Sequence, residues 1–244
     1  MRHSQNLEPT LLEYPDAERI FVIAPHPDDE VLGPGGTLLK AIKGGSRVRV
    51  LYLTKGRPAL AETVVSEATR SAAKAGYEQV FLECYSRCIP MDKGYLKQIR
   101  QEIEGFLPTV IMLPFFCDDH DDHRRASHLL YVLNEQKALD KKIQLWAYQV
   151  YTSLIPNVVI DITEVADSKR ELITYWQSQS KNRDWAHYAL GLNAYNSRFL
   201  PPNSSARFAE GFFVVPIADY CEIAAEYFTD VNSSYYLESY KNRG

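Results

Sequence analysis

Short apolar runs alternate with longer segments of helical spacing through the first half of the chain, and this alternation limits the possible folds more than any other feature. Four of these runs have the length and composition of buried β-strands, namely Arg19–Ile23, Arg47–Thr54, Gln79–Glu83 and Thr109–Leu113. A helix is expected after each run. Four strand–helix units in succession predict an α/β fold whose sheet is doubly wound and mostly parallel, with helices on both faces.

Local signals mark where the helices in this part of the chain end. Gly76 is the glycine expected just past a helix C-terminus, and Pro108 cannot continue the helix before it. One expected helix begins at Thr37. Three others cover the ranges Glu62–Ala75, Lys93–Phe106 and Arg124–Ala138.

The C-terminal third elaborates the same pattern. Further strands are expected over Gln144–Tyr151, Val158–Ile162 and Arg207–Val215. Helices are expected over Thr163–Gln177, with Thr163 as the N-cap, over part of Asn182–Leu200, and over Ala218–Phe228. The residues from Asn232 to Gly244 read as a polar tail. Since no linker or repeat divides the chain, we expect a single domain over 1–244, with a core over roughly 17–165 and an elaboration over 166–230.

Composition excludes several classes of partner. The 27 Lys and Arg against 31 Asp and Glu give a formal net charge of −4, so no basic field predicts binding to nucleic acid or to an anionic membrane. No apolar run approaches the roughly 20 residues that span a bilayer. The four scattered cysteines are expected to be reduced thiols, and the N-terminal residues are unlike a secretory signal. A cytoplasmic protein is therefore expected.

The segment Ala24–Glu30 concentrates one imidazole and three carboxylates at the turn between the first strand and its helix. Adjacent carboxylates repel one another, and a divalent cation would relieve that repulsion. His26 and Asp29 could both reach one metal ion, leaving Asp28 unligated beside it. A solvated loop with acids at a helix N-terminus is the alternative interpretation of this segment alone.

A second cluster of the same kind follows the fourth strand, over Cys117–Arg125. Ligands bind at the carboxyl ends of the strands in a doubly wound sheet, where the winding reverses. If the strand order is 3-2-1-4-5, the first and fourth strands are neighbours at that point, and the two clusters converge. Two acid/histidine clusters, each directly after an expected strand and before an expected helix, together favour a metal site.

Two histidines and one aspartate with an open fourth position form a known catalytic zinc arrangement. His26, Asp29 and His123 would supply these ligands, although another first-row divalent metal fits the same set. Zinc lowers the pKa of a bound water to about 7. Asp28 would then act as general base, while His120, if protonated, would donate to the oxyanion. Asp122 could bond the imidazole of His120 and raise its pKa.

The two clusters resemble the signatures of a known family. Ala24–Glu30 resembles the A-H-P-D-D-E signature of the LmbE/PIG-L-like zinc-dependent de-N-acetylases, with Pro25 as an extra residue. His120–His123 resembles the family's H-P-D-H signature, with Asp121 in place of proline. The likeness continues at Glu67–Gly76, Asp161–Val165 and Ala209–Phe212, so it spans most of the chain.

The resemblance implies a Rossmann-like fold and hydrolysis of an N-acyl group, usually the N-acetyl group of a glucosamine-containing molecule. It implies the same zinc ligands, with Asp28 as base, His120 as oxyanion stabiliser and Asp122 as its orienting partner. One position departs from the family, because many members place a sugar-contacting arginine in the second helix where this chain has Val64. Arg57 or Arg70 could substitute for it.

The sequence therefore predicts a zinc-dependent hydrolase that removes the N-acetyl group from an N-acetylglucosamine-type sugar or sugar conjugate. A metal-dependent phosphoesterase holding two metal ions is one alternative, and a non-catalytic sugar- or nucleotide-binding module is another. The expected partner is a small molecule or glycan bearing an N-acetyl group, and the chain could form a homo-oligomer.

Overall fold

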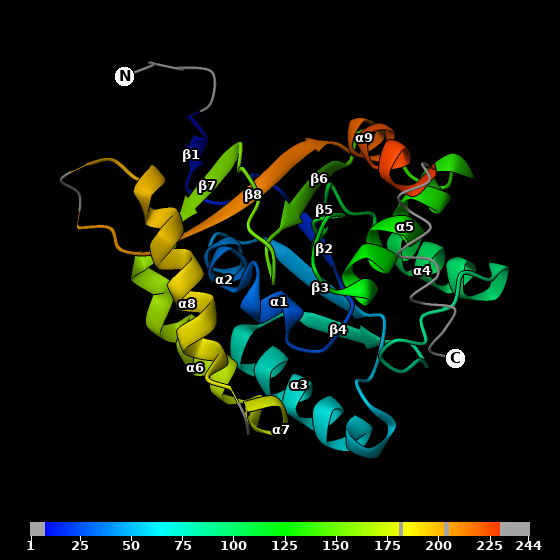
Figure 1. The fold of residues 1–244 in the computed structure, drawn as a ribbon, viewed down its shortest axis with the longest axis horizontal. Coiled ribbons are helices and arrows are strands. Elements are labelled where there is room, and N and C mark those ends of the chain that lie inside the picture. Colours follow the sequence, from blue (N-terminus) through cyan, green and yellow to red (C-terminus); the bar gives the residue numbers. More distant parts are fainter. Residues whose placement is uncertain (1–7, 181–182, 203–204, 230–244) are drawn as a thin grey trace.

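A sheet of eight strands organises the computed structural model, which describes residues 8–180, 183–202 and 205–229 (Figure 1). The strands are β1 (Thr10–Leu12), β2 (Arg19–Ala24), β3 (Arg47–Tyr52), β4 (Glu78–Phe81), β5 (Val110–Pro114), β6 (Gln144–Tyr148), β7 (Val158–Asp161) and β8 (Ala209–Pro216). The polar tail expected from Asn232 to Gly244 lies outside the described residues.

The strands lie in the order β1-β7-β8-β6-β5-β2-β3-β4. Strands β2 to β6 correspond to the first to fifth strands expected from the sequence, and they lie in the order 3-2-1-4-5. The winding therefore reverses between β2 and β5, as expected for that order. Only β8 runs antiparallel, between β6 and β7, which makes the sheet mostly parallel as predicted. The short edge strand β1 was not foreseen, because its three exposed residues carry no burial pattern.

The helices agree closely with the sequence pattern at most of their ends. They are α1 (Asp29–Leu32), α2 (Gly35–Lys43), α3 (Ala61–Ala75), α4 (Lys93–Phe106), α5 (Asp121–Glu135), α6 (Ala166–Thr174), α7 (Gln177–Ser180), α8 (Trp185–Asn196) and α9 (Ile217–Thr229), with short 3-10 turns at η2 (Pro58–Leu60), η3 (Thr163–Val165) and η4 (Ser197–Phe199). Gly76 adopts the left-handed conformation at the end of α3, as a C-terminal glycine should.

Two helices, α5 and α6, start three residues away from the predicted position. The helix expected from Arg124 begins three residues earlier, at Asp121, because the side chain of His120 caps it. Thr163 does not cap a long helix. It begins the turn η3, and its hydroxyl accepts hydrogen bonds from the backbone N–H groups of Arg207 and Phe208 instead.

Apolar side chains cover both faces of the sheet, as expected for a doubly wound fold. Along β2, Ile20 and Val22 pack into one core with residues of α2, α3, α6 and α8. Phe21 and Ile23, which point to the other face, pack with residues of α4, α5 and α9. Figure 1 shows these two groups of helices on opposite sides of the sheet.

Close packing fixes the segment that joins α1 to α2 against the sheet. A Cβ atom at Gly36 would lie 2.8 Å from the side chain of Ile162, and one at Gly33 would overlap the ring of Tyr148. Glycine at these two positions therefore allows the close packing of this segment against the sheet. No helix in the described ranges is both long and apolar enough to cross a membrane.

A buried ion pair anchors the same segment. Glu210 on β8 accepts hydrogen bonds from the backbone N–H groups of Gly36 (2.8 Å) and Thr37 (2.7 Å), at the start of α2. Its carboxylate also pairs with Lys169 at 2.7 Å, and the ammonium of Lys169 donates to the carbonyl of Gly33. The α1–α2 segment, which carries the first acidic motif, is therefore held by groups distant in the sequence.

Candidate metal centre and active-site cleft

The first acidic motif occupies the turn from β2 into α1, where the parallel strand ends. Asp29 is the first residue of α1 and is completely buried, as is Glu30 beside it. Oδ2 of Asp29 accepts a hydrogen bond from the backbone N–H of His26 at 2.8 Å. This bond folds the turn back on itself and brings the carboxylate to the imidazole of the same motif.

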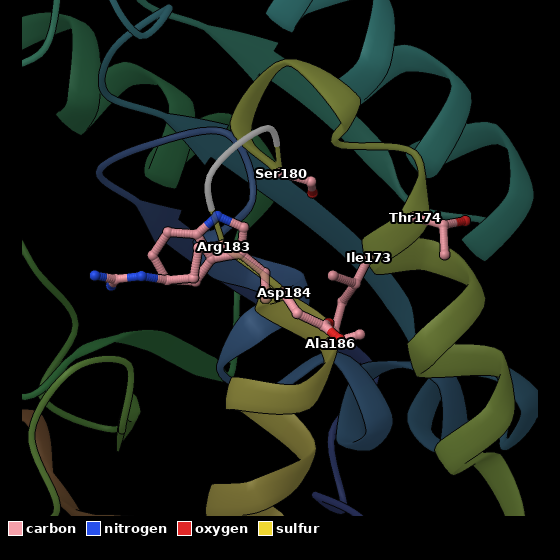
Figure 2. Close-up of a pocket in the computed structure, with 7 residues that line it drawn as sticks. Ile173, Thr174, Ser180, Arg183, Asp184 and Ala186 are labelled. Carbon is pink, nitrogen blue, oxygen red and sulfur yellow. The ribbon is translucent and has the colours of Figure 1, made fainter.

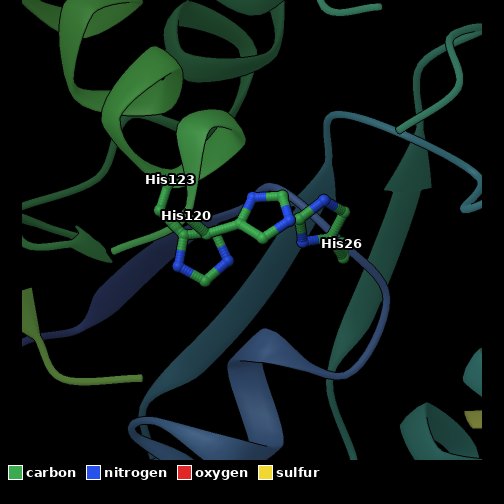
Figure 3. A group of neighbouring side chains, drawn as sticks. All are labelled: His26, His120 and His123. Carbon is green, nitrogen blue, oxygen red and sulfur yellow. The ribbon is translucent and has the colours of Figure 1, made fainter. Parts of the chain in front are cut away.

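The second motif meets the first because β5 lies beside β2. Oδ2 of Asp29 lies 3.2 Å from Nδ1 of His26 and 3.2 Å from Nε2 of His123. The two imidazoles proposed as ligands from the sequence thus meet at one carboxylate oxygen of the third proposed ligand, Asp29. His120 also approaches, since one ring nitrogen from each of His26, His120 and His123 lies within 4.8 Å of the others (Figure 3).

A second carboxylate lies behind each of the two ligand imidazoles. Nε2 of His26 is 2.7 Å from Oδ2 of Asp122, and Nδ1 of His123 is 3.0 Å from Oδ1 of Asp118. Carboxylate–imidazole pairs of this kind orient metal-ligating histidines and fix their tautomers. Asp118 had no assigned role in the sequence prediction, although it belongs to the acidic cluster that was singled out.

The donor set fits a metal ion. Oδ1 of Asp29 and Nε2 of His123, the ring nitrogen that faces away from Asp118, are buried and have no hydrogen-bond partner of good geometry among the described residues. Buried polar atoms are rarely left without a partner, so these atoms mark a position where a ligand is expected. Imidazole and carboxylate donors suit zinc and several other first-row metals.

The electrostatics of this cluster favour a cation. Burial alone would lower the pKa of His123, but the carboxylates of Asp29 and Asp118 outweigh it and raise the pKa to about 9. Burial opposes ionisation of Asp29, yet the imidazoles of His123 and His26 hold its pKa well below the ordinary range. Without a metal, protons on the imidazoles therefore balance the carboxylates, and a bound cation would displace them.

Asp28 lies beside the cluster in an unusual conformation. Its φ is 126°, a left-handed value that is rare for a residue with a side chain. Its carboxyl is buried, and burial together with the charge of Asp29 raises its pKa well above the usual range. The side chain lines the cleft that also exposes His26 and His120, so it faces the space open to a substrate.

Asp122 contacts both His26 and His120. Its carboxylate oxygen Oδ2 bonds His26 and the backbone N–H of Arg87, whereas its backbone N–H donates to Nδ1 of His120 at 3.1 Å. Burial first, and then the neighbouring imidazoles, lower the pKa of His120 to about 4, and they outweigh the rise that the Asp122 carboxylate contributes. Because Nδ1 accepts this hydrogen bond, the neutral ring carries its proton on Nε2.

A polar cleft opens over the cluster. Its lining includes Arg57, one of the two arginines proposed from the sequence to contact a sugar, whereas Arg70 lies over the ring of Tyr175. The lining residues are His26, Asp28, Gly56, Arg57, Ser86, Arg87, His120, Tyr151, Gln179 and Trp185. Of the two tryptophans between residues 175 and 195, Trp176 is buried, whereas Trp185 lines the cleft.

Trp185 also borders a second hollow, between the end of α6 and the start of α8. Figure 2 shows Ile173 and Thr174 on one side of it and Arg183 and Asp184 on the other. The guanidinium of Arg183 lies 4.9 Å from the centre of the Trp185 ring. A single aromatic side chain thus contributes to both depressions.

Comparison with known proteins supports the resemblance drawn from the motifs. The family model described as PIG-L, GlcNAc-PI de-N-acetylase, matches residues 21–133, a range that contains both acidic motifs. A diacetylchitobiose deacetylase from Thermococcus kodakarensis is 27% identical over 227 residues, which cover 82% of this chain and 84% of the relative.

Solved structures share the fold. The N,N'-diacetylchitobiose deacetylase from Pyrococcus horikoshii superposes with a TM-score of 0.70 at 22% identity, covering 84% of this chain and 86% of that one. The 4-carboxy-2-hydroxymuconate hydratase GalB from Pseudomonas putida gives a TM-score of 0.66 at 19% identity, covering 81% and 96%. Proteins named for different reactions therefore share this fold. The match of the PIG-L family model over residues 21–133 and the similarity to a diacetylchitobiose deacetylase thus agree with the resemblance of the two acid/histidine motifs to the LmbE/PIG-L-like de-N-acetylases.

Proposed function

We propose that this protein is a metal-dependent N-deacetylase that removes the acetyl group from an N-acetylglucosamine-type sugar or sugar conjugate. The observation that carries the proposal is the carboxylate of Asp29, which contacts the imidazoles of both His26 and His123, with Asp28 beside them at the cleft. The naming of the Thermococcus kodakarensis relative as a diacetylchitobiose deacetylase supports the substrate class.

His26, Asp29 and His123 would hold the metal, with zinc as the expected ion. When bound, the metal supplies Lewis acidity, which polarises the amide carbonyl and makes water acidic near neutral pH. The second-layer carboxylates of Asp122 and Asp118 keep the two imidazoles oriented toward Asp29. Metal binding thus uses groups that the fold already positions.

Asp28 would take the proton of the attacking water and pass it to the leaving amine. Its raised pKa makes the carboxylate a stronger base for the first step than an ordinary aspartate would be. His120 would donate from Nε2 to the oxyanion that forms as water adds to the amide carbon. This role needs only the neutral ring, which the lowered pKa of His120 favours. Arg57 is the candidate contact to the sugar or its substituent.

The test combines metal content with acetate release from N-acetylated glucosamine derivatives. We expect the His123→Ala protein to lose both the metal and the activity. Asp28→Asn and His120→Ala proteins should keep the metal but lose activity, by roughly 10²-fold or more, as removal of a general base or an oxyanion donor does. His187, an exposed histidine on α8, gives the control His187→Ala, which should match the parent protein in both measurements.

Two results would overturn this proposal. Acetate release that survives both Asp28→Asn and His123→Ala would exclude the site as the catalytic centre. Two tightly bound metal ions per chain, with hydrolysis of phosphate esters in place of amides, would favour the phosphoesterase alternative. The cytoplasmic location and the homo-oligomer expected from the sequence stay predictions.

A further inference from the structure

Two arginines, Arg57 and Arg87, line the cleft, and the loops that carry them are hydrogen-bonded to each other. Arg57 follows β3 and Arg87 follows β4. The backbone N–H of Ser86 donates to the carbonyl of Gly56 at 3.0 Å, so the residues just before the two arginines are hydrogen-bonded. The strand pairing of β3 with β4 therefore continues into the loops and delivers both arginines to the cleft lining.

The backbone of Arg87 is fixed relative to the candidate metal centre. Its N–H donates at 2.8 Å to Oδ2 of Asp122, the same oxygen that bonds His26. Its φ is 66°, a left-handed value that glycine adopts freely but that costs other residues of the order of 1 kcal/mol. A side chain kept at a strained position beside a catalytic cluster indicates that the side chain itself has a use.

Neither guanidinium has a carboxylate partner in the part of the chain that the structure describes. Five other arginines form ion pairs with carboxylates, namely Arg19, Arg47, Arg49, Arg100 and Arg124. No carboxylate of the described residues lies within 4.0 Å of the guanidinium of Arg57 or Arg87. Among the residues that line the cleft, Asp28 is the one acid, and the proposed mechanism already uses it.

We propose that Arg57 and Arg87, with Ser86 directly before Arg87, form an anion subsite that binds a carboxylate or phosphate carried by the N-acetylated sugar substrate. This inference rests on the proposed deacetylase function and specifies its substrate class. The planar guanidinium presents paired N–H donors that match the oxygens of carboxylate and phosphate, and two such groups on tied loops can clamp one anion. The hydroxyl of Ser86 lines the same part of the cleft and adds a donor.

The remainder of the cleft suits the neutral part of such a substrate. Tyr151 and Trp185 present rings 6.0 Å apart, and the ring of Tyr151 also stacks 5.1 Å from that of His123. Aromatic faces of this kind commonly pack against the apolar face of a sugar ring. The metal ligands, the aromatic rings and the two arginines thus divide the lining into places for the amide, the sugar and an anionic substituent.

Three substrates that share one N-acetylglucosamine ring test the proposal. They are the methyl glycoside, which is neutral, the carboxymethyl glycoside, which carries a carboxylate, and N-acetylglucosamine 1-phosphate. Acetate release gives kcat/KM for each with the metal-loaded full-length protein. We expect at least one anionic substrate to exceed the neutral one by about tenfold or more, as charge-assisted pairing with arginine gives. Which of the two leads identifies carboxylate or phosphate as the anion.

The variants Arg57→Gln and Arg87→Gln should each reduce the anionic-to-neutral ratio by about tenfold, and Arg→Lys substitutions should restore part of it. Arg100→Gln is the matched control, since Arg100 pairs with Glu104 on α4 away from the cleft and should leave the ratio unchanged. Calorimetric binding of the same three compounds to the Asp28→Asn protein gives a second readout that needs no turnover.

The outcomes separate this inference from the proposed function. Acetate release without any preference for the anionic compounds, or equal losses on all three substrates in both variants, would overturn the anion subsite alone. No acetate release from any compound would count against the deacetylase proposal. In that case the calorimetry still decides, because tighter binding of an anionic compound that depends on Arg57 and Arg87 supports the subsite, and equal binding of all three refutes it.

Discussion

The backbone N–H of Asp28 donates to Oε2 of Glu30 at 3.1 Å, and this hydrogen bond holds the proposed general base at its left-handed φ of 126°. Glu30 is itself completely buried. Its other oxygen accepts from the hydroxyls of Tyr52 (2.8 Å) and Tyr77 (2.7 Å). Burial raises the pKa of Glu30 to about 7, against the pull of these donors. Glu30 thus does more than favour a helix N-terminus.

We expect Glu30→Ala to destabilise the protein by about 3 kcal/mol or more, because several buried donors lose their acceptor at once. Acetate release should fall as well, since Asp28 loses the bond that fixes its backbone. Glu30→Gln keeps one acceptor oxygen for the N–H of Asp28, and the tyrosine hydroxyls can turn to accept from the amide. Denaturant unfolding and acetate assays of both variants check this. Equal losses in the two would show that the Asp28 contact does not matter.

Substitution of Asp28 should separate stability from activity. Asp28→Gly relieves a left-handed backbone and removes a buried acid that Asp29 repels, so we expect the metal-free protein to gain about 1 kcal/mol. Asp28→Asn removes only the charge, and should gain less. Both variants should lose activity by roughly 10²- to 10⁴-fold while they retain the metal. Unfolding curves, metal analysis and acetate release test this together, and a destabilised Asp28→Gly protein would contradict the strain argument.

Periodicity and local signals were enough to place the sheet core. β2 and β5 are largely continuous apolar runs, β3 and β4 end in apolar residues, and the helix ends at Gly76 and Pro108 have local causes, so short-range rules locate these elements. The order 3-2-1-4-5 was assumed as one of the common orders of a doubly wound sheet, and the structure has this order. β1 escaped prediction because it forms a strand only by pairing with β7, and nothing within Thr10–Leu12 indicates that pairing.

The candidate site was predictable as a set of residues but not as a network. The convergence of His26, Asp29 and His123 followed from the position of two motifs after adjacent strands. The carboxylate that pairs with each imidazole could not be predicted from the sequence. Asp122 contacts both histidine loops, and only the structure shows that its carboxylate faces His26. Arg87 and Trp185 reach the cleft through loop geometry, which carries no periodic signal in the sequence.

The buried pair of Lys169 and Glu210 supports the segment that carries the first motif, and we expect its two halves to be strongly coupled. Lys169→Met leaves the buried carboxyl of Glu210 without its counter-charge, and Glu210→Gln leaves Lys169 without one. Each single change should cost about 3–5 kcal/mol. The double variant should cost less than the sum, because neither charge then remains unpaired. A double-mutant cycle by denaturant unfolding measures this coupling, and additive effects would refute it.

His128 should make the stability of the protein depend on pH away from the metal centre. Its ring stacks on Phe228 with the centroids 4.5 Å apart, and burial, with a contribution from Arg125, lowers its pKa to about 4. The unfolded chain takes up this proton near the ordinary pKa of about 6.5, so the unfolded state binds more protons between these values. The contribution of His128 to the free energy of unfolding is therefore fully present above about pH 6.5, and it is lost as the pH falls from there toward about 4.

The variant His128→Phe keeps the stacked ring and removes the titration. We expect the parent protein to lose about 1–2 kcal/mol more than this variant between pH 7 and pH 5, as the difference in proton uptake requires. Denaturant unfolding of both proteins at the two pH values measures the double difference, in which the other titrating groups cancel. Parallel pH profiles would mean that His128 titrates in the folded protein as it does in the unfolded chain. That result would place solvent at the interface of α5 and α9, where the structure has a stacked pair of rings.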